Sequence, residues 1–297
     1  MIKPYKNRRS AEKILGTYNE LLKQWDTIIE ERDIETTYGS THVIVAGKID
    51  GLPVMLFHGV GDDSALMWLY NAKEWAEEFR LYAVDTIGGP GKSKPNSAYN
   101  ESFDVARWVD EVREHLGLGK VNLIGVSHGG YLVQYYNLVR HEWVDKAISM
   151  ASSVPDENSG STMKKMMKVF FPEAFFPTNK NVKKLLHKMA GRNVGVFTEN
   201  ERIMTHYKWL LKGFNNMAMR YHKIKKFSVS EINVIRENTY YLIGEEDPFE
   251  KLGGKEALIQ HKMKVRFFEE TGHGINHEKA EEVNQLVHQI ITNRINL

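Results

Sequence analysis

The chain has 297 residues, of which 42% are hydrophobic and 26% charged, and its formal net charge is +2. This ordinary composition supplies enough apolar side chains for a sizeable core and argues against large-scale disorder. Because there is no cysteine, disulfides, thiolate metal sites and a cysteine nucleophile are excluded.

The first 26 residues mix charged and apolar side chains, and we expect a helix at about residues 10–25. They lack the uninterrupted apolar stretch of a secretory signal. No segment approaches the roughly 20 apolar residues that a membrane-spanning helix requires. We therefore expect a soluble, cytoplasmic protein without a membrane span.

Further along, short apolar runs alternate with stretches of helical period, which is typical of βα units that build a parallel sheet. The first two strands differ, since residues 34–38 and 41–46 flank Gly39-Ser40 and predict an antiparallel hairpin. The other strands are expected at residues 53–57, 81–85, 121–126, 146–151, 239–243 and 265–269. Helices are expected at residues 65–78, 103–116, 130–140, 254–261 and 278–293.

Residues 160–230 interrupt this rhythm with 15 Lys and Arg against three Glu, a balance of +12 that leaves −10 for the rest of the chain. We therefore expect a helical cap inserted at residues 155–229, and a core built from residues 1–154 and 230–297. The positive charge either attracts anionic substrates or an anionic surface, or it is solvated and complements the acidic core. The sequence favours the second explanation.

Gly125-Val126-Ser127-His128-Gly129 matches the pattern G-x-S-x-G. Such a short pattern occurs by chance in roughly one chain in ten of this length. Here it follows an apolar strand and precedes a helical stretch, which is the setting of a nucleophile elbow, and the glycines suit a turn too tight for side chains. Ser127 is the predicted nucleophile; the alternative is a Gly-rich turn with an incidental serine.

A serine hydroxyl needs a base to take its proton and a third group to orient that base. In a strand-turn-helix arrangement of this kind, the acid follows the serine and the histidine comes last. Asp247 lies in a loop that leaves a strand, and His273 lies between the final strand and the final helix. We predict that Ser127, Asp247 and His273 form a catalytic triad.

Each of the two later residues has a rival. Glu246 competes with Asp247, but Pro248 ends the turn directly after the aspartate. His277 competes with His273, but His277 falls where the last helix is expected to begin. We favour Asp247 and His273.

Attack on a carbonyl creates a negatively charged oxygen that needs preorganised N–H donors. The stretch His58-Gly59-Val60-Gly61 follows the strand at residues 53–57, where a second donor is expected. We assign the oxyanion hole to the backbone amides of Val60 and His128. Taken alone, the glycines here would indicate only a turn.

Five blocks in chain order resemble those of the α/β-hydrolase family, across roughly residues 30–295 apart from the insert. They are Phe57-His58-Gly59, Asp85 to Ser93, Gly125 to Gly130, Gly244-Glu245-Glu246-Asp247 and Gly272-His273. Within the family the chain is most similar to bacillus-type carboxylesterases. The resemblance implies an α/β-hydrolase fold with a mostly parallel eight-stranded sheet flanked by helices, a helical cap over the active site, and acyl-enzyme hydrolysis without a cofactor.

Two positions depart from the family pattern. Pro90 adds a residue to the block that usually reads D-x-x-G-x-G-x-S, so the family's substrate contacts in that loop are not transferred. His128 follows the nucleophile where many relatives carry a smaller or apolar residue. It either tunes the site electrostatically or packs under the cap, and we favour packing.

The insert carries apolar residues at helical spacing, which suits a packed core and also an apolar substrate site. They are Met163, Met166, Met167, Phe170, Phe171, Phe175 and Phe176. We predict that Met163, Met167 and Phe171 contact the substrate.

The leading hypothesis is a serine carboxylesterase that acts on a small or medium apolar ester. The same triad would serve an aminopeptidase, a thioesterase, an acyltransferase, a cofactor-free peroxidase or a C–C hydrolase. A non-catalytic small-molecule receptor is a further alternative, although it would not require an intact triad. We expect no metal, because there is no H-E-x-x-H motif, no cofactor and no nucleic-acid partner. The oligomeric state stays open.

Overall fold

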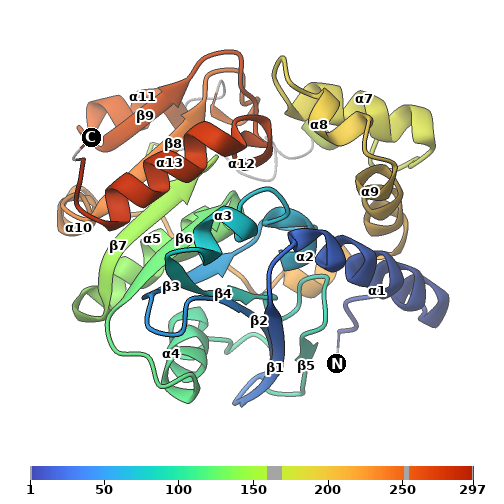
Figure 1. Ribbon diagram of the computed structural model, residues 1–297, viewed down its shortest axis with the longest axis horizontal. Helices are drawn as coiled ribbons and strands as arrows, with labels where there is room; N and C mark the ends of the chain where they lie inside the picture. The colour runs from blue at the N-terminus through green and yellow to red at the C-terminus, as the bar shows by residue number, and fades with distance from the viewer. Residues whose placement is uncertain (1, 159–168, 251–253, 296) are drawn as a thin grey trace.

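The computed structural model describes residues 2–158, 169–250, 254–295 and 297. Its centre is a mostly parallel sheet with the strand order β1-β2-β4-β3-β6-β7-β8-β9, and the short β5 pairs with β2 (Figure 1). The strands are β1 (Ile29–Thr36), β2 (Gly39–Gly47), β3 (Leu52–Phe57), β4 (Phe79–Val84), β5 (Lys94–Pro95), β6 (Val121–Val126), β7 (Val144–Met150), β8 (Thr239–Gly244) and β9 (Lys264–Phe268).

Helices cover both faces of this sheet. Along β3, Val54 and Leu56 join a hydrophobic cluster with residues of α3 and α13, whereas Met55 and Phe57 join a second cluster with residues of α4 and α5. This alternation follows from the two-residue period of a strand. The helices outside the insert are α1 (Arg8–Leu22), α2 (Ser64–Met67), α3 (Ala72–Ala76), α4 (Val105–His115), α5 (His128–Val139), α11 (Gly254–Gln260), α12 (Ile275–Glu278) and α13 (Ala280–Ile291).

The hairpin at the start of the sheet turns two residues earlier than the sequence predicts. Thr36 pairs with Gly39, so the turn consists of Thr37 and Tyr38, and Gly39 belongs to β2. A Cβ on Gly39 would lie 2.2 Å from the carbonyl oxygen of Lys94, and the glycine has a φ of +128°. Glycine is therefore required here by the close approach of β5, not by the turn.

Two predicted helices are each broken in two. The helix predicted at residues 65–78 is divided into α2 and α3. The helix predicted at residues 278–293 starts three residues earlier and is divided into α12 and α13. Asn71, at the first break, donates hydrogen bonds from its side chain to the carbonyl oxygen of Asn276 and to Oδ1 of Asn284. Buried amide pairs therefore join the interrupted helices to each other, a tertiary effect that helical periodicity does not reveal.

Between β7 and β8 the chain forms α7 (Asn179–Met189), α8 (Gly195–Thr198), α9 (Glu201–Gly213), a short 3-10 turn and α10 (Val229–Ile235). Figure 1 shows α7, α8 and α9 gathered on one side of the molecule, with α1 alongside α9. Thr17 of α1 hydrogen bonds to His206 of α9 across a distance of 2.7 Å. The N-terminal helix thus packs directly on the insert.

None of the helices in the described part of the chain combines the length and the apolar composition that crossing a bilayer requires.

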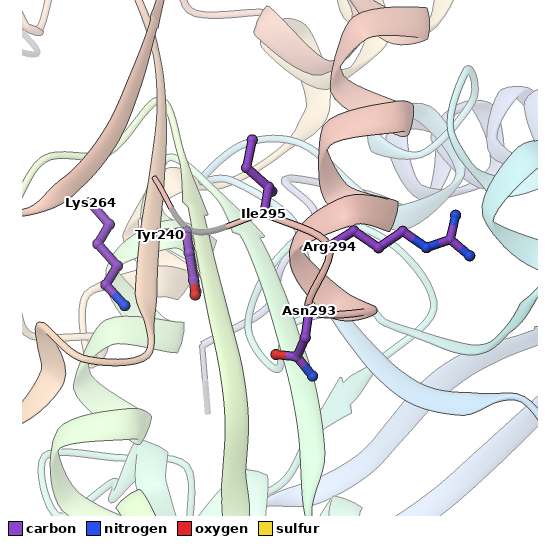
Figure 2. Close-up of a pocket in the computed structure, with 5 residues that line it drawn as sticks. All are labelled: Tyr240, Lys264, Asn293, Arg294 and Ile295. Carbon is purple, nitrogen blue, oxygen red and sulfur yellow. The ribbon is translucent and has the colours of Figure 1, made fainter.

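A pocket of about 350 Å³ is lined by Tyr240, Lys264, Asn293, Arg294 and Ile295 (Figure 2). Tyr240 and Lys264, which face each other near the amino ends of β8 and β9, form one side of it. Ser127 follows the carboxyl end of β6, which runs parallel to these strands. The pocket therefore lies at the amino ends of the parallel strands and Ser127 at their carboxyl ends, so this pocket is not the candidate site.

Candidate active site

Ser127 occupies the sharp turn between β6 and α5. Its backbone has φ 56° and ψ −116°, a conformation that side-chain-bearing residues rarely adopt. The turn is held by two hydrogen bonds, from the amide of Ser127 to the Met150 carbonyl and from the amide of Tyr131 to the Ser127 carbonyl. Backbone strain of this kind persists only where the surroundings enforce it, and it is common at active sites.

The glycines on either side of Ser127 make this turn possible. A Cβ on Gly125 would lie 2.0 Å from the carbonyl oxygen of Gly129, and a Cβ on Gly129 would lie 2.0 Å from the carbonyl oxygen of Phe57. No side chain fits at either position. The sequence pattern around Ser127 therefore has a direct steric cause.

Asp247 and His273 lie in neighbouring loops beyond the carboxyl ends of β8 and β9. His273 Nδ1 is 2.7 Å from Asp247 Oδ2, and Asp247 is completely buried. The other oxygen, Oδ1, accepts a hydrogen bond from the amide of Phe249 at 2.8 Å. A carboxylate on Nδ1 keeps a proton there, so Nε2 is left as an acceptor for a hydroxyl proton.

The two rival residues lie elsewhere. Glu246 is exposed, and its backbone amide donates to the carbonyl of Thr271. His277 is buried in α12, where its Nε2–H donates to the Leu66 carbonyl at 3.0 Å. Burial lowers the pKa of His277 to about 4, so this ring is neutral near pH 7. The structure pairs His273 with Asp247 and brings neither rival into that pair.

The loop that carries His273 is held by the insert and by Glu278. The amide of His273 donates to the carbonyl of Met189 at 2.6 Å. The buried Glu278 carboxylate accepts hydrogen bonds from the amides of Gly191, at 2.7 Å, and Gly272, at 3.2 Å. Burial raises the pKa of Glu278 despite these donors. Sequence reasoning missed Glu278; its one signal was a carboxylate at the start of the last helical stretch.

Ser127 and His273 both lie close to the segment that runs from the end of β3 through α2. Among the hydrogen bonds of the described residues, none links the Ser127 hydroxyl to the His273 ring. A Cβ on Gly59 would lie 3.3 Å from Cβ of Ser127, so the loop after β3 abuts the serine. The helix that follows this loop, α2, contacts α12, the helix that follows His273. The side chain of Asn276 in α12 donates to the carbonyl of Met67 in α2 at 2.6 Å. The serine and the histidine loop therefore flank one short stretch of chain.

Of the two predicted oxyanion donors, His128 directly follows Ser127, and Val60 directly follows Gly59, where a Cβ would lie 3.3 Å from Cβ of Ser127. Val60 belongs to the loop after β3, and His128 is the first residue of α5. Neither amide donates to a protein acceptor in the described part of the chain. The ring of His58 steadies this loop, since Nε2 accepts from the amide of Thr86 at 2.9 Å and Nδ1–H donates to the Gly59 carbonyl at 2.8 Å.

The side chain of His128 packs among aromatic rings. It meets the ring of His222, a residue of the insert, edge-on at 5.3 Å, and it lies 6.0 Å from the ring of Tyr131. Burial, and secondarily the neighbouring His222 and His58, lower the pKa of His128 to about 3. The ring is therefore neutral near pH 7 and contributes packing in place of a charge.

The loop with the additional Pro90 is organised around Asp85. This buried carboxylate accepts from the amide of Lys92 at 2.7 Å and from the hydroxyl of Tyr18 at 3.1 Å. A Cβ on Gly91 would lie 2.4 Å from Oδ2 of Asp85. The loop thus ties the sheet to α1.

The predicted substrate contacts are only partly placed. Met163 and Met167 lie outside the described residues. Phe171 is 54% exposed and packs edge-on against Phe175, and no described ring contact joins it to His273. The neighbouring Phe170 instead lies 6.1 Å from the ring of Phe249, and Phe249 lies 4.9 Å from His273.

Phe249 is a second residue that sequence reasoning missed. Its signal was its place two residues after Asp247. The pair formed by Phe170 and Phe249 gives the catalytic candidates an apolar border.

In the described ranges, no group of three or more His, Asp or Glu side chains has the arrangement of a metal site.

A family model described as the alpha/beta hydrolase fold matches residues 53–201, which is half of the chain. In sequence, the chain is 38% identical over 131 residues to the uncharacterized carboxylesterase nap of Bacillus subtilis (strain 168), and 37% identical over 139 residues to carboxylesterase YbfK of the same organism. These alignments cover 44% and 47% of this chain, and 43% and 47% of the relatives. They therefore compare about half of each curated protein.

Solved structures are similar over almost the whole chain. Naproxen esterase from Bacillus subtilis has a TM-score of 0.81 at 24% identity and covers 96% of this chain and 99% of its own. Carboxylesterase CesB (YbfK), also from Bacillus subtilis, has a TM-score of 0.78 at 23% identity, with 97% and 100% covered. At these identities the likeness shows a shared fold. This chain belongs to the α/β-hydrolase fold family.

Proposed function

We propose that this protein is a serine hydrolase that cleaves a small or medium apolar carboxylic ester through an acyl-enzyme intermediate. The observation that carries the proposal is the strained Ser127 together with the buried Asp247–His273 pair. The amides of Val60 and His128, which have no acceptor among the described residues, support it. The names of the curated relatives, both carboxylesterases, point to the same bond type.

In the proposed reaction the Ser127 hydroxyl attacks the ester carbonyl while Nε2 of His273 takes its proton. The buried Asp247 carboxylate stabilises the imidazolium that forms. The negative oxygen of the tetrahedral intermediate accepts hydrogen bonds from the amides of Val60 and His128. As the C–O bond breaks, His273 returns the proton to the leaving alcohol. Water then attacks the acyl group by the same steps, releasing the acid and restoring the serine.

The first step requires a hydrogen bond between Ser127 and His273 that this structure does not contain. Such bonds are often long in the absence of substrate and tighten in the complex.

Other reactions of this triad remain as alternatives: peptide, thioester or C–C bond cleavage, and acyl transfer. An apolar border formed by Phe170 and Phe249 favours an apolar acyl or alkyl group over a charged peptide terminus. Met163, Met167 and Phe171 stay predicted as additional contacts. We also propose that residues 155–229 act as the cap over the core of residues 1–154 and 230–297.

The test is labelling by a fluorophosphonate probe together with turnover of p-nitrophenyl esters. We expect the wild-type protein to be labelled by the probe and to hydrolyse the esters. Ser127→Ala should be neither labelled nor active. Labelling that survives this substitution would contradict the assignment. Wild-type protein that binds esters without hydrolysing them would indicate the receptor alternative instead.

A cytoplasmic location stays a prediction, which rests on the absence of cysteine. Cell fractionation would test it.

A further inference from the structure

Three phenylalanines lie exposed beside a lysine-rich helix at one end of the insert. Phe171, Phe175 and Phe176 are 54%, 58% and 66% exposed. Directly after them, α7 presents three exposed lysines, Lys180, Lys183 and Lys184. We call these six residues the cap-tip surface. A contiguous patch of exposed apolar side chains marks an interaction site more often than apolar side chains that are scattered singly.

Hydrogen bonds hold the phenylalanine turn against α7. The side chain of Asn181 donates to the carbonyl of Phe176 at 2.8 Å, and Lys188 donates to the carbonyl of Phe171 at 3.2 Å. The rings of Phe171 and Phe175 touch edge-on, with 5.8 Å between their centroids. The aromatic and basic parts therefore form one continuous surface.

The exposed face of α7 carries positive charge. Val182, Leu185 and Leu186 are buried, whereas the lysines at positions 180, 183 and 184 share the opposite face at helical spacing. No ion pair between these lysines and an acid occurs within the described part of the chain, whereas the neighbouring Lys188 pairs with Glu173. Figure 1 shows α7 at an outer corner of the molecule, away from the sheet.

The cap-tip surface is connected to the candidate active site in two ways. The last residue of α7, Met189, accepts the hydrogen bond from the amide of His273. Next to Phe171, Phe170 packs on Phe249, which packs on the His273 ring. A molecule that reaches this surface is therefore separated from the catalytic candidates by a short apolar path.

We propose that the cap-tip surface docks the protein reversibly on an anionic lipid bilayer, so that apolar esters enter the site from the membrane. Aromatic rings settle at the headgroup level, and lysines gain attraction from anionic lipids while their stems stay in contact with apolar groups. The charge asymmetry of the chain, +12 in residues 160–230 against −10 elsewhere, would turn this side toward the lipid. An acidic protein partner would use the lysines but has no need of three protruding rings.

The test is co-sedimentation of the full-length protein with vesicles of phosphatidylcholine alone and of phosphatidylcholine with 30% phosphatidylglycerol (roughly one anionic lipid in three). We expect binding only to the anionic vesicles, and weaker binding at high salt. Phe175→Ser/Phe176→Ser and Lys180→Glu/Lys183→Glu/Lys184→Glu should each weaken the binding by at least about tenfold. Both variants should keep wild-type kcat/KM on a water-soluble ester.

Matched substitutions at exposed positions outside the proposed cap serve as controls. Ile28→Ser/Ile49→Ser removes two exposed apolar side chains, and Lys48→Glu/Lys120→Glu/Lys262→Glu reverses three exposed charges. Neither should alter vesicle binding. If the wild type does not bind anionic vesicles, or if only the lysine variant loses binding, the bilayer proposal is wrong, and the second outcome would show electrostatic adsorption without a role for the exposed rings. Ser127→Ala should bind like the wild type, so this test stands apart from the proposed chemistry.

Discussion

Asp247 is the residue whose role is sharpest at the level of single side chains. It is completely buried, so it orients His273 without reaching a substrate. Asp247→Asn should therefore lower kcat by about 10³- to 10⁴-fold, because the ring would be held in the wrong tautomer, and should leave KM nearly unchanged. Steady-state kinetics on a p-nitrophenyl ester measures both. Glu246→Gln is the matched control, and it should behave as wild type; the opposite pattern would move the acid to Glu246.

A second buried pair, Asp63 with His206, has no place in the proposed reaction. Nε2 of His206 is 2.8 Å from Oδ2 of Asp63, both side chains are fully buried, and the ring also bonds to Thr17. Asp63 also accepts from the amide of Leu66 at the start of α2. The pair thus links α1, α9 and the loop after β3.

Removing one partner of this pair should be costly. His206→Leu would leave Asp63 as an uncompensated buried charge, and we expect the free energy of unfolding in urea to fall by about 3–5 kcal/mol. His288→Leu removes a hydrogen bond of the same kind to the exposed Glu78 and should change stability far less. Equal losses in the two variants would show that burial does not set the cost.

At the scale of elements, the contact between α1 and α9 depends on one glycine. A Cβ on Gly213 would lie 2.6 Å from Cβ of Ser10, whereas a Cβ on Gly16, inside α1, would have nothing within 4 Å. Gly213→Ala should therefore lower the melting temperature because the two helices would be pushed apart. Gly16→Ala should raise stability by about 0.5–1 kcal/mol, since it adds helix propensity without a clash. Thermal unfolding of both variants measures this, and stabilisation by Gly213→Ala would contradict the packing argument.

For the whole molecule, stability should depend on pH through buried neutral histidines. Burial lowers the pKa of His128 to about 3 and those of His222 and His277 to about 4, whereas the unfolded chain would titrate near 6.5. Their contribution to stability is complete above pH 6.5 and is lost as the pH falls. Asp62 acts oppositely, because burial and the adjacent Asp63 raise its pKa to about 7.

These pKa shifts predict how the free energy of unfolding changes with pH. Below about pH 6.5 the unfolded chain would bind more protons than the folded protein at the three histidines, and fewer at Asp62 and Glu278. The three histidines outnumber the two acids, so the free energy of unfolding should fall as the pH falls from about 6.5 to 4. His277→Asn should make this dependence on pH shallower in urea titrations at several pH values. A slope unaffected by this substitution would mean that His277 is not held neutral by the fold.

The sequence by itself indicated a parallel sheet covered by helices, because buried parallel strands leave short apolar runs and covering helices leave a period of 3.6. The α/β-hydrolase fold followed from the resemblance of five ordered blocks to that family. It also singled out Ser127, Asp247 and His273, since a strained turn needs flanking glycines and the loops after parallel strands meet at one edge of the sheet. Only the tertiary structure decided the place of the hairpin turn, the broken helices, the hold of Met189 and Glu278 on the histidine loop, and the exposure of Phe175 and Phe176. These features depend on contacts between residues distant in the chain, which local periodicity does not encode.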